Sequence, residues 1–337
     1  MKAEKKLLFI INAHSGRGLI RNHLLEIINL FVRGGFEVVV YTTQGARSAS
    51  SLVAAHGDEF DLVVVSGGDG TLNEAVSGIL SGQVDVPLAY LPAGSTNDFG
   101  RSLGISQIPY HAAKQALFGR EFWCDAGRFE DLDAPEHDPL GVSHFVYVAA
   151  FGAFADVSFE TPQELKNVFG HSAYFMRAFR TLSELKPIRA RLEFNGEVIE
   201  DDFISGMVTN SHFVGGVIQL DSRRISLSDG QFEITMIRNP KNPADLTQIL
   251  VDLGQKNTST SRMIYRAQVS GLKVISEEPI LWTIDGEDGG VHKRVKLSNL
   301  HNAFRIFAPD ENIDQLDPAL GEEDEIDEAD RFKEENE

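Results

Sequence analysis

Short apolar runs alternate with helical patterns through the first third of the chain. Runs rich in Val, Ile and Leu occupy residues 6–12, 36–43, 61–67 and 86–92, and a segment with helical spacing of apolar residues follows each of them. Strands that alternate with helices form parallel βαβ units with right-handed crossovers. The pattern therefore predicts an α/β domain with a parallel sheet over residues 1–124.

The pattern changes after Cys124. Most later runs are rich in Val, Ile, Phe and Thr and are separated by turn residues, which is typical of antiparallel strands. One helical pattern interrupts them at about residues 166–185. We therefore expect a β domain over residues 125–307, from which the chain can return to the first domain after about residue 300.

Composition narrows the class of protein. Of the 337 residues, 42% are apolar, which is typical of a globular chain. Cys124 is the only cysteine, which excludes an internal disulfide framework and fits the reducing cytosol. No apolar stretch approaches the ~20 residues that a helix needs to span a bilayer.

The charge is strongly acidic and uneven. A formal charge of −19 argues against nucleic acid as a partner, because phosphate backbones require a basic surface. Residues 310–337 carry fourteen Asp or Glu against Arg331 and Lys333. A segment this acidic and poor in apolar residues buries little surface, so we expect a disordered tail whose simplest role is to keep the protein soluble.

A glycine-rich turn lies between the third predicted strand and its helix, with the sequence S-G-G-D-G-T-L-N-E from Ser66 to Glu74. Glycines let backbone N–H groups approach an anion closely, whereas a plain turn is the simpler alternative. Thr71 and Glu74 have the spacing of a capping box, which predicts a helix that begins at Thr71. A carboxylate beside phosphates needs a cation, so Asp69 suggests Mg²⁺, bound directly or through water.

A second loop, P-A-G-S-T-N-D-F from Pro92 to Phe99, follows the next predicted strand. Neighbouring loops at the carboxyl ends of parallel strands form one crevice, although Ser95 to Asp98 alone also fits an ordinary helix cap. The turns after the first two strands reach the same sheet edge and offer hydroxyl, amide and backbone donors. The residues concerned are Asn12, Ser15, Gly16, Thr42 and Thr43.

With these motifs the sequence resembles the bacterial diacylglycerol kinase and lipid kinase family, which is related to sphingosine and ceramide kinases. The resemblance covers about residues 6–307 and also includes FGHSAYF, SDGQFEI and WTIDGEDGG. It implies an N-terminal nucleotide domain, a C-terminal antiparallel β-sandwich and an active site in the cleft between them. It also implies ATP and Mg²⁺ as cofactors and a lipid alcohol as acceptor, with diacylglycerol first.

The resemblance also implies residue roles. Glu287 matches the proton acceptor and Asp229 matches a ligand of a structural Mg²⁺, whose other ligands are backbone carbonyls near Ser226 and Gln231. Asp69 joins Glu287 as a catalytic residue. The sequence departs from the family pattern at Ala13, where proline is usual, at Ser95, where threonine is usual, and at Gly100, where alanine is common. Besides the five turn residues, the expected nucleotide contacts are Gly67, Gly68, Asp69, Gly70, Thr71, Leu72, Asn73, Glu74, Gly94, Ser95, Asn97, Asp98 and Asp285.

A carboxylate at position 287 suits this chemistry, because a lipid alcohol must lose its proton as the phosphoryl group transfers. Residues D-G-E-D-G-G also fit a polar hairpin turn. Three alternatives stay open: an NAD or sugar kinase, a kinase for a sphingoid base or ceramide, and a nucleotide- or lipid-binding regulator without turnover. A lipid acceptor implies peripheral contact with the inner membrane face from the cytoplasm, and the sequence leaves a homodimer open.

Overall fold

The structure is a computed structural model, which describes residues 5–15, 20–135, 142–152, 186–210, 213–214, 218–219, 227–254 and 261–309. The predicted helix at 166–185, the acidic tail at 310–337, Gly16 and Ser226 lie outside these residues. Within the described part, no helix is long and apolar enough to cross a membrane.

The N-terminal part contains four parallel strands, in the order β2–β1–β3–β4. β1 and β3 are almost wholly buried. Helices cover both faces of such strands, which explains why their sequences are runs of apolar residues. The elements are β1 (Lys5–Ile11), α1 (Ile20–Arg33), β2 (Phe36–Thr42), α2 (Ser48–His56), η1 (Gly57–Glu59), β3 (Leu62–Gly67), α3 (Asp69–Gly82), β4 (Leu88–Pro92), α4 (Asp98–Ser102) and α5 (Pro109–Phe118).

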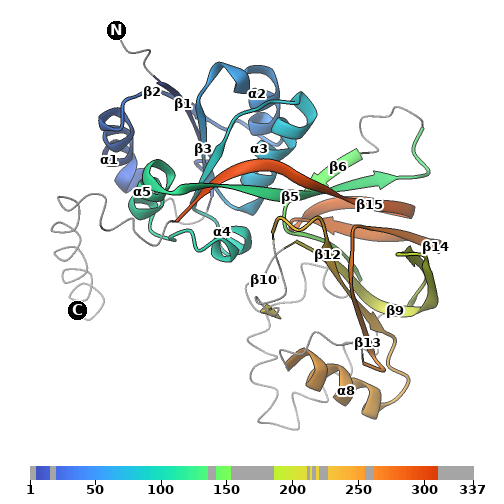
Figure 1. The fold of residues 1–337 in the computed structure, drawn as a ribbon. Helices are drawn as coiled ribbons and strands as arrows, with labels where there is room; N and C mark the ends of the chain where they lie inside the picture. The colour runs from blue at the N-terminus through green and yellow to red at the C-terminus, as the bar shows by residue number, and fades with distance from the viewer. Residues whose placement is uncertain are drawn as a thin grey trace, which may run out of the picture.

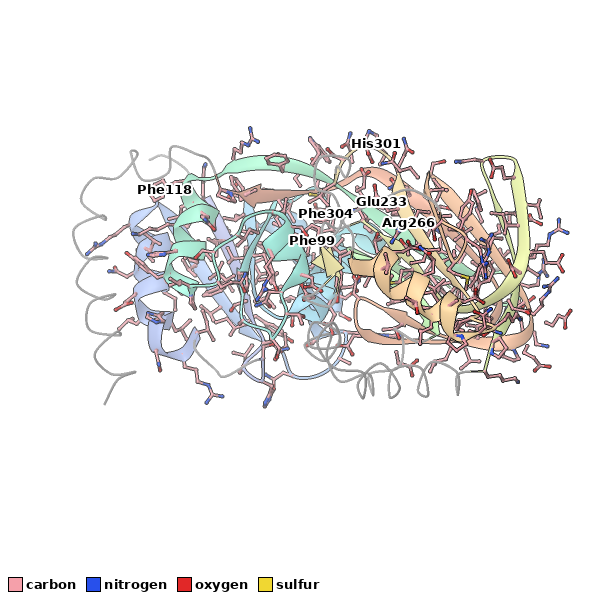
Figure 2. The ribbon with its side chains drawn as sticks, turned by 90° about the horizontal axis from the view of Figure 1, so that it is seen from below. Phe99, Phe118, Glu233, Arg266, His301 and Phe304 are labelled. Atoms are coloured by element: carbon pink, nitrogen blue, oxygen red, sulfur yellow. The ribbon has the colours of Figure 1, made fainter. Side chains whose placement is uncertain are left out.

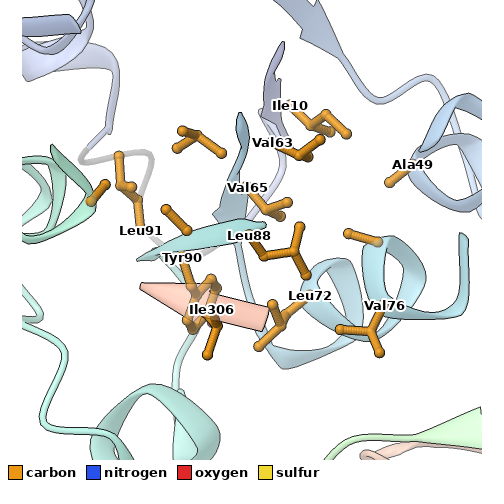
Figure 3. Close-up of a cluster of buried hydrophobic side chains, with 14 of the residues drawn as sticks. Ile10, Ala49, Val63, Val65, Leu72, Val76, Leu88, Tyr90, Leu91 and Ile306 are labelled. Atoms are coloured by element: carbon orange, nitrogen blue, oxygen red, sulfur yellow. The ribbon is translucent and has the colours of Figure 1, made fainter. Parts of the chain in front are cut away.

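Helices cover both faces of these strands. Figure 1 shows α1 and α5 on one side of the parallel strands and α2 and α3 on the other. On the first side, Phe9 of β1 meets Phe31 of α1 edge to face, with ring centroids 5.7 Å apart. Figure 3 shows the packing around α3, where Leu72 and Val76 lie near Val65 of β3 and Leu88 of β4. Packing against these helices therefore holds the carboxyl ends of the strands in fixed positions.

The start of α3 differs from the prediction. The helix begins at Asp69, with Gly68 as its N-cap, and not at Thr71. No side chain caps it, so the predicted capping box is wrong. The Glu74 carboxylate instead accepts hydrogen bonds from the backbone N–H groups of Arg47, at 2.8 Å, and Ala49, at 3.1 Å, at the start of α2. The Glu74 carboxylate therefore binds the start of α2 and does not form the capping bond within α3 that the sequence spacing suggested.

The C-terminal part is mainly antiparallel and surrounds a second core built around Phe151, Phe203, Phe232 and Trp282. The prediction of an α/β part followed by a β part is confirmed. The elements are β5 (Arg120–Asp131), β6 (Val142–Phe145), β7 (Val148–Gly152), β8 (Ile188–Phe194), β9 (Glu197–Thr209), β10 (Phe213–Val214), β11 (Ile218–Gln219), β12 (Phe232–Arg238), α8 (Pro243–Gly254), β13 (Ile264–Val269), β14 (Gly271–Ile284) and β15 (Glu287–Ala308).

The long strand β15 joins the two parts. It pairs antiparallel with β14 and β5, and near its end Ile306 pairs in parallel with Leu88 of β4, so one sheet continues through the molecule. Phe99 of α4 and Phe304 of β15 lie between the two parts, with ring centroids 6.1 Å apart (Figure 2). The N-terminal core also includes Val148 and Met207 from the β part. This shared packing fixes the β14–β15 hairpin relative to α3.

Candidate active site

The two glycine-rich loops touch each other at the ends of β3 and β4. A methyl group placed on Gly94 would lie 2.6 Å from Gly68 Cα, so position 94 has no room for a side chain at this approach. The Ala93 N–H donates to the Gly67 carbonyl at 2.8 Å and continues the pairing of the strands. The two loops that the sequence placed at one crevice therefore form a single surface.

Asp69 connects the two loops. Its carboxylate accepts hydrogen bonds from Thr96 Oγ1 at 3.2 Å, from the Asp98 N–H at 3.1 Å and from the Phe99 N–H at 3.4 Å. Burial raises the pKa of Asp69, and these hydrogen bonds partly oppose that rise. A metal ion bound directly to this carboxylate would compete with three protein donors, so a link through water suits the geometry better.

Asn97 shapes the second loop from inside. Its backbone is left-handed, with φ 51°, and its side chain is 4% exposed. Oδ1 accepts from the Gly94 N–H at 2.9 Å and from the Tyr90 hydroxyl at 3.2 Å, while Nδ2 donates to the Gly94 carbonyl and to Gln107. These bonds show that the side chain holds the loop in shape, and the nucleotide contact expected of Asn97 stays a prediction. Ser95 and Thr96 are exposed on the same loop.

The first turn lies against the start of α3. Asn12 Nδ2 donates to Thr71 Oγ1 at 3.0 Å, and a methyl group on Gly67 would collide with the same hydroxyl. The Thr43 N–H donates to the Ile11 carbonyl at 2.9 Å, which holds the turn after β2 beside the turn after β1. Four of the predicted turn residues therefore lie at one sheet edge, namely Asn12, Ser15, Thr42 and Thr43.

The β14–β15 hairpin brings Glu287 to this edge. Its two-residue turn, Asp285 and Gly286, has φ values of 48° and 82°, which is the type I′ geometry that Asp-Gly favours. Glu287 begins β15, and a methyl group placed on Gly70 would lie 3.0 Å from Glu287 Oε1. The predicted base therefore lies directly against the first turn of α3, and its carboxylate is exposed.

Asp285 anchors this hairpin. It is 3% exposed and accepts four hydrogen bonds: from the Val146, Tyr147 and Val148 N–H groups at 2.7–3.0 Å and from Asn73 Nδ2 at 2.6 Å. Burial raises the pKa of Asp285 to about 6, although the four donors oppose the rise. These bonds tie Asp285 and Asn73 to the position of the hairpin, and the nucleotide contacts expected of both residues stay predictions.

The predicted structural metal site is described only in part, since Ser226 lies outside the described residues. Asp229 is exposed, and its Oδ1 accepts from the Gln231 N–H at 3.0 Å. Among the described residues, no group of three or more His, Cys, Asp or Glu side chains could hold a metal. One carboxylate with backbone carbonyls nevertheless suits Mg²⁺, which keeps several of its own waters.

Sequence reasoning missed the support of this turn. The fully buried Asp125 of β5 accepts from the Gly230 N–H at 2.7 Å, from His301 Nδ1 at 3.0 Å and from the Asn302 N–H at 2.8 Å. Its own N–H donates to the Leu227 carbonyl at 2.7 Å. No spacing in the sequence relates these residues, because the contacts form only when β5, β15 and the turn before β12 meet.

Comparison with known proteins adds family evidence to this geometry. The diacylglycerol kinase catalytic domain family matches residues 6–128, and the C-terminal NAD kinase beta sandwich-like domain of YegS matches residues 148–306. A protein of Bacillus subtilis (strain 168) named diacylglycerol kinase is 29% identical over 317 residues, covering 93% of this chain and 99% of its own. The diacylglycerol kinase of Staphylococcus aureus (strain JH9) is 28% identical over 331 residues, covering 95% and 99%.

Solved structures share the fold. A crystal structure of a diacylglycerol kinase from Bacillus anthracis str. Sterne superposes with a TM-score of 0.70 at 21% identity, and it covers 93% of this chain and 100% of its own. A second structure from the same organism gives a TM-score of 0.73 at 22% identity. The two matched domain families cover both parts of the described fold in order, and the chain belongs to the bacterial diacylglycerol kinase and lipid kinase family.

Proposed function

We propose that this chain transfers the γ-phosphate of ATP to the free hydroxyl of diacylglycerol, forming phosphatidic acid, in the cleft between its α/β and β parts. The observation that supports this most directly is the position of Glu287 beside Gly70, where a methyl group placed on the glycine would lie 3.0 Å from Glu287 Oε1. It places an exposed carboxylate beside a glycine-rich helix start, so a proton acceptor and a phosphate-binding turn face the same space.

The residues divide the work between binding and proton transfer. Backbone N–H groups from Gly68 to Gly70, at the positive end of α3, bind the nucleotide phosphates. The Glu287 carboxylate takes the proton of the lipid hydroxyl as its oxygen attacks the γ-phosphorus, and ADP leaves with the electron pair of the broken P–O bond. A Mg²⁺ ion that arrives with ATP would neutralise phosphate charge, and Asp69 lies where it can hold water bound to that ion.

The direct test is transfer of labelled phosphate from ATP to lipids in mixed micelles. Diacylglycerol, ceramide and a sphingoid base are compared, with NAD and a sugar as water-soluble acceptors. We expect labelled phosphatidic acid to be the main product and to require Mg²⁺. Strong transfer to ceramide or the sphingoid base would reassign the acceptor, transfer only to NAD or the sugar would reassign the class of kinase, and ATP binding without transfer would indicate a regulator.

A bilayer substrate has consequences for location. The proposal places the protein at the inner membrane face as a peripheral protein that reaches its substrate from the cytoplasm. Sedimentation with vesicles that contain diacylglycerol tests this contact. A homodimer stays a prediction, which light scattering of the purified protein would test.

A further inference from the structure

Tyr147 lies at the centre of the contacts that hold the hairpin against α3. It is located between β6 and β7, and its N–H donates to Asp285 Oδ1 at 3.0 Å. Its carbonyl accepts from the Asn210 N–H at 2.9 Å. The backbone is therefore fixed on both sides, and the side chain is only 6% exposed. A residue held this firmly presents its hydroxyl at a defined point.

That point is beside the hairpin turn and the two glycine-rich loops. A methyl group placed on Gly286, the residue before Glu287, would lie 3.5 Å from the Tyr147 hydroxyl. Burial raises the pKa of Tyr147 well above its ordinary value, and the nearby carboxylates of Asp285, Asp69 and Asp98 raise it further. The phenol therefore stays protonated at neutral pH and keeps an O–H donor among negative groups.

This donor is not used within the protein as far as the structure describes it. No described residue forms a hydrogen bond with the Tyr147 hydroxyl, whereas the neighbouring Tyr90 hydroxyl shares its one proton between the Gly67 carbonyl, at 3.1 Å, and Asn97 Oδ1, at 3.2 Å. An O–H donor that no described residue accepts, held 3.5 Å from a methyl group placed on Gly286, suggests a partner that arrives with the substrates.

We propose that Tyr147 is a further active-site residue, whose hydroxyl donates a hydrogen bond to a γ-phosphate oxygen of the bound nucleotide and keeps it during transfer. The inference rests on the proposed function and deepens it. Glu287 can only accept a proton, and the nearby aspartates repel phosphate, so the site needs donors aimed at the charge that moves. The phenol supplies one from the β part, opposite the backbone donors of α3.

The test replaces Tyr147 by phenylalanine, which keeps the buried ring and removes only the hydroxyl. We expect kcat for lipid phosphorylation to fall about 10²- to 10³-fold, as for the loss of one preorganised donor, while Tm stays unchanged. Calorimetry with Mg²⁺ compares a non-hydrolysable ATP analogue with ADP, and the preference for the analogue should fall about tenfold. Tyr265→Phe is the matched control, since its hydroxyl reaches Glu197 at 3.3 Å in the β part.

The nucleotide measurement decides the inference independently of turnover. If Tyr147→Phe keeps the wild-type preference for the analogue over ADP, the inference is overturned, whether or not the wild type phosphorylates lipids. A fall in that preference with Tm retained supports it. A loss of kcat that comes with a large fall in Tm, while the preference for the ATP analogue over ADP is unchanged, would show that the Tyr147 hydroxyl only stabilises the fold. Wild-type protein that transfers phosphate to no lipid defeats the proposed function alone.

Discussion

Replacing Gly70 with alanine should separate catalysis from stability. The added methyl group would lie 3.0 Å from Glu287 Oε1, and no other group is as close. The obstacle is the far end of a side chain in an exposed hairpin, which can move, and not a backbone atom. Because Gly70 lies in the first turn of α3, alanine also suits the helix better than glycine does. The substitution therefore disturbs one carboxylate without disturbing the fold.

The size of the effect follows from the distance. To reach an ordinary carbon–oxygen separation of about 3.5 Å, the carboxylate must withdraw by about 0.5 Å. A displacement of 1 Å in a positioned group can reduce a rate about 10²-fold, so half of that displacement predicts a fall in kcat of about tenfold. Helix propensity predicts a free energy of unfolding that is unchanged or higher by about 0.5 kcal/mol.

The assay measures kcat with micellar diacylglycerol, nucleotide affinity by calorimetry, and Tm. Gly78→Ala in the same helix is the matched control, because its methyl group would lie 2.6 Å from the Ser50 carbonyl and 2.9 Å from Val53 Cβ. Backbone cannot withdraw easily, so Gly78→Ala should lose about 1–3 kcal/mol of stability while the folded enzyme keeps its kcat. The two variants should therefore show opposite patterns of loss.

A double-mutant comparison links the effect to Glu287. In a Glu287→Gln background, the added Gly70→Ala change should alter kcat little, because its target has already lost its function. Full wild-type kcat in Gly70→Ala would refute the contact as the basis of catalysis. Equal and independent losses in the single and double variants would show that the methyl group acts elsewhere, for example on nucleotide phosphates.

Three other predictions address single carboxylates. Glu287→Gln should lower kcat about 10²- to 10⁴-fold and leave nucleotide affinity in calorimetry intact, and more than a tenth of wild-type kcat would place the base elsewhere. Asp69→Asn should abolish turnover in a protein that circular dichroism shows to be folded; near-normal kcat would remove its role. Burial raises the pKa of Glu233 to about 7, so its contribution to stability, present at low pH, is lost as pH rises from about 4.5 to 7. Without added metal, Glu233→Gln should therefore raise Tm at pH 8 and change it little at pH 5.

The sequence predicted the parts of the site that are local. The glycine-rich loops and their position after β3 and β4 follow from a buried run next to glycines, and the Asp-Gly pair at residues 285 and 286 predicts a hairpin turn. Local spacing failed where a tertiary partner competed. Glu74 had the position of a capping-box residue, yet it binds the start of α2, because α2 and α3 pack together and offer unpaired N–H groups.

The roles of polar residues inside the motifs were harder to predict. The sequence predicts Asn73, Asn97 and Asp285 as nucleotide contacts, and in the structure all three side chains also form hydrogen bonds within the protein. Residue type cannot distinguish a carboxylate that binds a ligand from one that satisfies backbone N–H groups. Only the partners decide, and those partners come from strands far away in the chain.

Under the proposed mechanism, Asp285 and Glu287 have different roles in the same hairpin. Glu287 is exposed, and in the proposed mechanism its carboxylate must stay free to reach a lipid hydroxyl. Its neighbour Asp285 provides the rigidity, since four donors from α3 and the β6–β7 segment hold it. A reactive carboxylate two residues from a fully bonded one can therefore stay free to act and still start each reaction from the same place.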